Sequence, residues 1–162
     1  ELSNDSFMES FRFVLPGYNL RPLEMSGAIG RSQLIKLGGI VEGRRRNAEV
    51  FRRCFSKIQG ISIQEEVGES SWFGFSIVIN NGKIRSELVS LLQDAGVEVR
   101  PIVAGNFVRN PVVSMMEYET HGEMDVADHI HYNGLFFGNH HYDISTEIEN
   151  ISEIISNFAG VS

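Results

Sequence analysis

The sequence has 162 residues, of which 42% are hydrophobic and 22% charged, and this is enough apolar material for one buried core. Its net charge of -7 argues against non-specific nucleic-acid binding, because such binding depends on Lys and Arg at phosphate groups. We expect a cytoplasmic protein without a membrane partner, since the single cysteine, Cys54, suits a reducing compartment and no apolar run reaches the roughly 20 residues of a membrane-spanning helix.

Two helices are expected in the first part of the chain, after an irregular stretch that ends at about Asn19. The spacing of apolar residues predicts a helix over Glu24 to Leu37, which Gly38-Gly39 ends or kinks. A second helix is predicted over Val41 to Ile58, with Gly60 as its expected stop.

The rest of the chain alternates strands and helices. Strands are predicted at Ile61 to Ile63, Trp72 to Ile79, Val97 to Val103 and Leu135 to Phe137, and helices at Ile84 to Asp94, Asp125 to Tyr132 and Ser145 to Phe158. The hydroxyl of Ser145 is the expected N-cap of the last helix. This order predicts an α+β domain whose small sheet is covered by helices on one face.

The most unusual segment is a Gly-aromatic-Asn turn that leads directly into a helix, over Pro16 to Leu34. It resembles the Gly-Tyr-Asn-x-Arg segment of the DegT family of pyridoxal-phosphate (PLP) sugar aminotransferases and dehydratases. Further segments at Asp94 to Phe107, Thr120 to Glu123 and Leu135 to His140 are similar to those of nucleotide-sugar 3-dehydratases in this family, especially those acting on GDP-4-keto-6-deoxymannose. With matching segments in the same order over Phe11 to Phe158, the chain is identified as a member of the family.

The resemblance implies that the chain is a C-terminal fragment of a longer, fold type I PLP-dependent enzyme. Residues 23–162 would be its small C-terminal domain, a small, mostly antiparallel sheet covered by helices. Residues 1–22 would be an N-terminal segment with a cofactor-reaching loop, the remnant of the link to a missing large domain. The implied function is that of a 4-keto-6-deoxyhexose 3-dehydratase in deoxysugar and lipopolysaccharide O-antigen biosynthesis. Its partners would be its own large domain, a second subunit in a homodimer, and a nucleotide-sugar substrate.

Two polar residues follow the turn at Gly17. Carried over from the family, Asn19 would contact the cofactor phosphate of the neighbouring subunit, and Arg21 would pair with an anionic group of the substrate through its planar guanidinium. The alternatives are that Asn19 closes its own turn and that Arg21 is solvated or caps a helix. The resemblance decides in favour of the cofactor for Asn19, whereas both interpretations of Arg21 stay open.

Arg100 ends a predicted strand and precedes the loop that carries Asn106. A loop that follows a strand is a favourable place to aim side chains into a cleft. The resemblance implies that Arg100 and Asn106, with Arg109, contact the sugar or the cofactor. The alternative for Arg100 is a structural ion pair with Glu98 or Glu123.

All five histidines lie in the last third of the chain. His140 follows Gly138-Asn139, and the resemblance implies that it faces the active site and donates to the substrate; an exposed loop histidine is the alternative. A metal site is not expected, because His129 and His131 lie two residues apart on a predicted helix and point in different directions.

Five arginines, Arg44 to Arg46 with Arg52 and Arg53, make a basic helix within an acidic chain. We expect these side chains to be solvated and to pair with Glu42 and Glu49 at helical spacing. A docking surface for an acidic partner is the less favoured alternative.

The cofactor chemistry requires a residue that this chain does not offer. PLP aminotransferases bind the cofactor through a lysine Schiff base, but Lys36 and Lys57 lie on predicted helices and Lys83 follows a turn. In the related dehydratases a histidine replaces the lysine and pyridoxamine phosphate (PMP) is used, and either residue would lie upstream of Glu1. We therefore expect the chain to be inactive alone. A nucleotide-sugar aminotransferase fragment and a stand-alone, non-catalytic binding domain stay open as alternatives.

Overall fold

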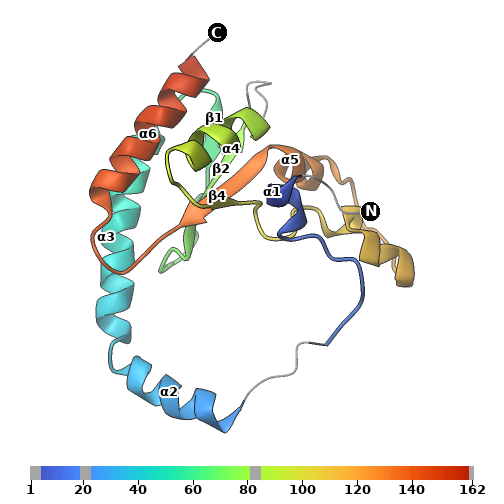
Figure 1. Cartoon of the computed structure of the whole chain (residues 1–162), viewed down its shortest axis with the longest axis horizontal. Coiled ribbons are helices and arrows are strands. Elements are labelled where there is room, and N and C mark those ends of the chain that lie inside the picture. Colours follow the sequence, from blue (N-terminus) through green and yellow to red (C-terminus); the bar gives the residue numbers. More distant parts are fainter. Residues whose placement is uncertain (1–4, 19–22, 81–84, 161–162) are drawn as a thin grey trace.

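The computed structural model describes residues 5–18, 23–80 and 85–160, and Figure 1 shows a twisted sheet with long helices packed along one side. In order across the sheet, the strands are β1 (Ile61–Ile63), β2 (Gly74–Ile79), β4 (Gly134–Gly138) and β3 (Val99–Arg100). Every neighbouring pair is antiparallel. Although β4 comes last in the sequence, it therefore lies between β2 and β3.

Three helices cover one face of the sheet: α3 (Leu37–Phe55), α4 (Arg85–Asp94) and α6 (Ser145–Gly160). Helix α6 packs along α3 and against α4. Alternate residues of the central strands, Phe75 and Ile77 in β2 and Leu135 and Phe137 in β4, are buried in the core, because strand side chains point in turn to opposite faces. The predicted α+β domain with a small antiparallel sheet is confirmed.

Aromatic rings form the centre of the core between α3 and the sheet. Phe51 of α3 stacks on Phe75 with 4.4 Å between ring centroids and lies 4.5 Å from Phe55. Phe137 and Trp72 complete the cluster at 6.0 and 6.1 Å from Phe51. Each fully buried Phe stabilises the fold by roughly 1.5–3 kcal/mol through removal of apolar surface from water, so this cluster fixes α3 on the sheet.

Two residues with left-handed backbone explain why two strands are shorter than predicted. Trp72 has a φ of 50°, and β2 begins two residues later, at Gly74. Val103 has a φ of 48° and Pro101 has no N–H for a ladder bond, so the predicted strand Val97 to Val103 is reduced to the two residues of β3. A positive φ in a bulky residue costs about 1–3 kcal/mol and persists only where tertiary contacts hold it.

Several predicted helix ends were also wrong. Helix α2 is Glu24–Leu34 and α3 begins at Leu37, so Gly38-Gly39 lies inside α3 instead of ending α2. Ser145 is the first residue of α6, and both its N–H and its hydroxyl donate to Asp143 Oδ1. Asp143, not Ser145, therefore supplies the side-chain acceptor at the start of α6.

The N-terminal stretch, expected to be irregular, contains the short helix α1 (Ser6–Glu9), capped by Asp5 Oδ1. Its Phe7 is buried in the core, with the guanidinium of Arg85 5.1 Å from the ring centroid. Residues 5–9 therefore pack with the core of the sheet. The division predicted between residues 22 and 23 falls at the edge of residues 19–22, which lie outside the described part of the chain, so it stays a prediction. Between β3 and β4 the chain forms the 3-10 turns η1 (Phe107–Arg109) and η2 (Pro111–Met115) and helix α5 (Asp125–Asn133).

Helix α2 is unusual because none of its residues is buried. In Figure 1 it projects away from the sheet, beyond the start of α3. Its apolar side chains Met25, Ile29 and Leu34 are 73%, 59% and 67% exposed. The apolar spacing that predicts a helix here is present, but within the described structure these side chains have nothing to pack on.

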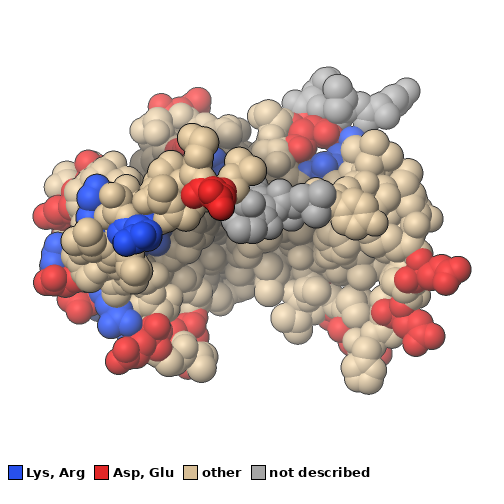
Figure 2. Space-filling model, turned by 90° about the horizontal axis from the view of Figure 1, so that it is seen from below, with Lys and Arg blue, Asp and Glu red and all other residues tan. Residues whose placement is uncertain are grey.

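Charged side chains of both signs interleave on the face shown in Figure 2, which is viewed from the side on which α2 lies. Most of the visible Lys and Arg side chains gather toward the left of this view, the side of α2 and α3, and Asp or Glu side chains lie among them. Among the described helices, none has the length and apolar character to cross a bilayer.

Candidate functional site

The structure describes three of the five predicted site residues. Asn19 and Arg21 lie outside the described residues, so their roles stay predictions. Arg100 ends β3, Asn106 caps η1, and His140 lies in the loop after β4. Arg100 lines a cavity, and Asn139, which directly precedes His140, lines the same cavity. Asn106 lies elsewhere, in a hydrogen-bond network with Asp128.

A cavity of about 390 Å³ lies between β3, the end of β4 and the first turns of α6, and we call it the sheet-end pocket. Part of its lining is apolar, with Val97, Ile144, Ile148 and Ile151. The functional groups around it are two guanidinium groups, two carboxylates, one amide and three aromatic rings, from Arg44, Arg100, Glu98, Glu147, Asn139, Phe73, Phe136 and Phe137. This combination suits a ligand that carries both hydroxyl and anionic groups.

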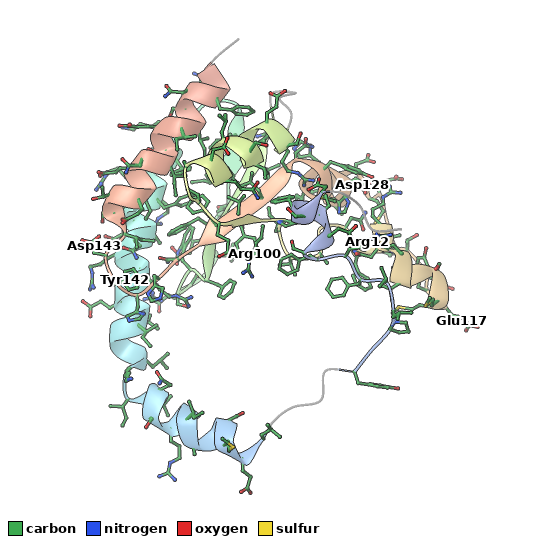
Figure 3. All side chains as sticks on the ribbon, in the orientation of Figure 1. Arg12, Arg100, Glu117, Asp128, Tyr142 and Asp143 are labelled. Carbon is green, nitrogen blue, oxygen red and sulfur yellow. The ribbon has the colours of Figure 1, made fainter. Side chains whose placement is uncertain are left out.

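Arg100 is held at this pocket by an ion pair. Its Nε donates to Glu98 Oε1 at 2.9 Å, and its guanidinium lies 6.0 Å from the ring centroid of Phe11. Half of the Arg100 side chain is still exposed, at 51%. In Figure 3 it is directed away from α4 and α6. The structural ion pair with Glu98 is therefore present, and it leaves the guanidinium accessible from the pocket.

Arg44 was expected to be a solvated, paired residue of the basic helix, and this expectation was wrong. The other four arginines of that helix have acidic partners: Arg45 with Glu69, Arg46 with Glu42, Arg52 with Glu66 and Arg53 with Glu149. Arg44 has no ion pair with any described residue; its guanidinium instead lies 5.6 Å from the ring centroid of Phe73. No local pattern distinguishes it, because the distinction depends on which side of α3 faces the pocket.

His140 lies on the surface next to this cationic group. Its ring stacks on Tyr142 with 3.8 Å between centroids, and His141 lies 4.5 Å away. Partial desolvation by its neighbours lowers the pKa of His140 below its ordinary value, and the nearby His141 and Arg44 lower it further. The imidazole is therefore neutral at pH 7, with one N–H donor and one acceptor nitrogen.

Asn139 fixes the geometry around the pocket, a role that the sequence did not reveal. Its side chain is buried, and Nδ2 donates to the backbone oxygens of Arg44 at 3.0 Å and Trp72 at 2.9 Å. Its Oδ1 accepts from Asn47 Nδ2 at 3.1 Å. These bonds tie α3, the start of β2 and the end of β4 together, and they hold Trp72 in its left-handed conformation.

Asn47 extends this connection to the loop that carries the histidines. Its Nδ2 also lies within hydrogen-bonding distance of the carbonyl oxygens of His140, at 2.9 Å, and Tyr142, at 2.8 Å. One turn earlier, a Cβ on Gly43 would lie 1.9 Å from the carbonyl oxygen of His141, so only glycine fits there. We call Asn47 and Asn139 the asparagine hub, because together they set the position of the 139–142 loop on α3.

Asn106 lies in another network, between η1 and α5. Its Oδ1 accepts from the N–H of Val108, and its Nδ2 donates to Asp128 Oδ1 at 2.8 Å. Arg109 also pairs with Asp128, and these hydrogen bonds lower the pKa of Asp128 to about 2. The Asn106 amide thus has partners within the chain, and a contact with the sugar stays a prediction.

A second cavity, of about 480 Å³, lies between the N-terminal segment and the loop after β3. Its lining includes Met8, Arg12, Pro101, Val103, Arg109 and His131. Both arginines already have partners, Arg12 with Glu9 at 2.9 Å and Arg109 with Asp128. His131 Nδ1 accepts from the N–H of Asn106, and burial lowers its pKa. Charged groups here are engaged within the protein, unlike Arg44 in the sheet-end pocket.

The described residues do not form a complete cofactor site. Lys36 and Lys57 are exposed and line neither cavity, and Lys83 lies outside the described part of the chain. No group of three His, Cys, Asp or Glu within the described ranges is arranged to hold a metal ion. A PLP-dependent reaction would therefore need residues beyond those that the structure describes.

A small antiparallel sheet with helices on one face is the fold of a PLP-dependent aminotransferase-like domain. Residues 2–157 match the DegT/DnrJ/EryC1/StrS aminotransferase family, and the chain belongs to this family.

Among its relatives, the GDP-4-keto-6-deoxy-D-mannose 3-dehydratase of Yersinia pseudotuberculosis is 51% identical over 156 residues, which are 94% of this chain and 40% of that protein. The E. coli enzyme of that name, solved with bound hydrated PLP, matches with a TM-score of 0.80 and 50% identity over 94% of this chain and 40% of its own. The lipopolysaccharide biosynthesis protein RfbH of Salmonella typhimurium is 34% identical over 119 residues, which are 70% of this chain and 27% of RfbH. The chain thus spans about 40% of the length of the two dehydratases.

Proposed function

We propose that this chain is the C-terminal part of a PLP- or PMP-dependent nucleotide-sugar 3-dehydratase that acts on GDP-4-keto-6-deoxymannose in deoxysugar and O-antigen biosynthesis. The observation that carries the proposal is the 51% identity with a GDP-4-keto-6-deoxy-D-mannose 3-dehydratase over 94% of the chain. The similarity to RfbH supports the link with lipopolysaccharide. The complete protein would work in the cytoplasm.

In this proposal the chain binds and orients the sugar nucleotide, while the upstream large domain holds the cofactor. PLP or PMP, when bound, supplies the electron sink for loss of the C3 hydroxyl. Arg100 would bind an anionic group from the rim of the sheet-end pocket. His140, neutral at pH 7, would donate a hydrogen bond to the substrate. Asn19 and Arg21 would contact the cofactor phosphate of the second subunit and the substrate.

The exposed apolar surface of α2 supports a larger assembly. Monomeric proteins rarely leave a contiguous apolar surface of this kind open to water. Leu23, Met25, Ile29, Leu34 and Ile35 are each more than half exposed. We propose that this surface packs on the chain's own large domain and on the second subunit of a homodimer.

The first test is the coding sequence upstream of Glu1. A reading frame that continues into a large domain with histidine at the cofactor position supports the 3-dehydratase, and a lysine there supports an aminotransferase instead. The complete protein is then assayed with PLP or PMP for loss of the C3 hydroxyl from GDP-4-keto-6-deoxymannose. A start codon directly before Glu1 would overturn the proposal and leave a binding domain.

A further inference from the structure

We propose that Arg44 binds a phosphate group of the nucleotide sugar in the sheet-end pocket. This inference rests on the proposed function, because it assigns one chemical group of that substrate to one residue. It concerns an arginine that neither the sequence motifs nor the predicted site includes.

The arginines of α3 differ in their pairing. Four of the five have a carboxylate within 4 Å, whereas Arg44 has no such partner among the described residues. Arg44 is also only partly exposed, and it lines a pocket. A half-buried guanidinium has lost part of its hydration, so an anionic ligand there restores favourable interactions that no described side chain supplies.

The position of Arg44 is fixed before any ligand arrives. Its backbone oxygen accepts from Asn139 Nδ2 at 3.0 Å, and the preceding Gly43 packs directly on the backbone of His141. Phe73 lies 5.6 Å below the guanidinium, and this ring is itself 6.4 Å from Phe136. A guanidinium placed on an aromatic face keeps its N–H edge free, and this edge matches two oxygens of a phosphate.

The other charged groups of the pocket favour a phosphorylated sugar over a simple anion. Glu98 is engaged by Arg100, so it does not neutralise Arg44. Glu147 also lines the pocket, and its carboxylate is an acceptor for sugar hydroxyl groups. The neighbouring side chains of His140 and His141 carry no negative charge that would repel a phosphate.

Direct binding of GDP tests this assignment independently of catalysis. In the complete protein, the dissociation constant for GDP is measured by calorimetry for the wild type, Arg44→Met and Arg46→Met. Arg46 lies on the same helix but is 62% exposed and paired with Glu42, so it is the matched control. We expect Arg44→Met to weaken GDP binding about 10-fold or more. Arg46→Met should change it by less than about two-fold.

Steady-state kinetics give the second readout. The KM for the sugar nucleotide should rise with the GDP dissociation constant in Arg44→Met, while kcat stays within about three-fold. Arg44→Lys keeps the charge but loses the planar edge, so it should lie between the wild type and Arg44→Met.

The outcomes separate this inference from the proposed function. If the wild type binds GDP and Arg44→Met binds it equally well, the phosphate assignment is wrong, even where KM for the sugar nucleotide rises in that variant. A wild type that does not bind GDP overturns it as well. If Arg44→Met weakens GDP binding but the wild type does not dehydrate the sugar, the phosphate site stands and the proposed activity fails. Unchanged thermal unfolding of each variant shows that folding is not the cause.

Discussion

Helices α2 and α3 follow each other in the chain and both carry apolar residues at helical spacing, yet they have opposite surroundings. Helix α3 buries Ala48, Phe51 and Phe55 against the sheet, whereas α2 buries no residue. The difference shows that an amphipathic pattern predicts a helix and its need for a partner surface, but not where that surface lies. For α3 the partner is the sheet of this chain, and for α2 we propose that it is the rest of the enzyme.

The largest loss of stability is expected from a substitution in the buried face of α3. Phe51→Ala removes a fully buried ring that stacks on Phe75, and it should lower the free energy of unfolding by about 3–5 kcal/mol. Urea denaturation followed by circular dichroism measures the loss. Phe73→Ala is the matched control because Phe73 is 75% exposed, and it should cost less than about 1 kcal/mol. Equal losses from both variants would show that the aromatic cluster does not hold α3.

The next largest loss of stability is expected from a substitution in the asparagine hub. Asn139→Ala removes the side-chain donor to the buried carbonyl of Trp72 and the half-buried carbonyl of Arg44, and we expect a loss of about 2 kcal/mol in the free energy of unfolding. Asn80→Ala is the control, since Asn80 is exposed and bonds to Ser62 at the surface. A loss below about 0.5 kcal/mol in Asn139→Ala would mean that water replaces the hub.

His140 should produce a smaller, pH-dependent effect in the loop that packs on α3. Partial desolvation, His141 and Arg44 lower its pKa in the folded state below the ordinary value of 6.5. The unfolded chain therefore takes up a proton first, and stability falls as the pH drops from about 6.5 toward the lower, folded-state pKa.

An NMR titration of the imidazole protons measures the pKa of His140 directly. The midpoint should lie below 6.5, and His141→Gln should raise it, because a neighbouring positive charge is removed. A midpoint at or above 6.5 in the wild type would contradict this description of the loop.

The smallest effect on stability is expected in α2. Replacing Ile29 and Leu34 together by Ser should change the free energy of unfolding of this chain by less than about 1 kcal/mol, since both side chains are more than half exposed. The same variant should bind less hydrophobic dye and self-associate less in analytical ultracentrifugation. A large loss of stability would show that α2 packs on this chain after all.

Most of the fold could be predicted because periodicity is a local signal. The alternation in β2 and the apolar spacing of α6 identified both elements from their own residues. The left-handed conformation of Trp72 could not be predicted, because it depends on Asn139, 67 residues away. Similarly, the bond between Asn47 and Asn139 joins positions 92 residues apart, and only the placement of Asn47 between Gly43 and Phe51 on one helix face hints at it.

The candidate site could be predicted only in part, for the same reason. Arg100 and His140 were singled out through the family resemblance, and the structure places them near the sheet-end pocket. Arg44 was grouped with the solvated arginines of its helix because spacing along a helix predicts which charges can meet on that helix, not which of them meet a partner from another element. That Arg44, unlike the other four arginines, faces the pocket follows only from how α3 packs on the sheet.

The strand order β1-β2-β4-β3 has a consequence for how the domain is made. During synthesis β2 emerges long before β4, so one edge of β2 stays unpaired until Gly134–Gly138 arrives. The nascent chain cannot complete its sheet or form the asparagine hub while that strand is still missing. Folding of this domain must therefore wait until β4 has been made, and translation that stops before residue 134 would release a chain with an open β2 edge, a substrate for chaperones and proteases.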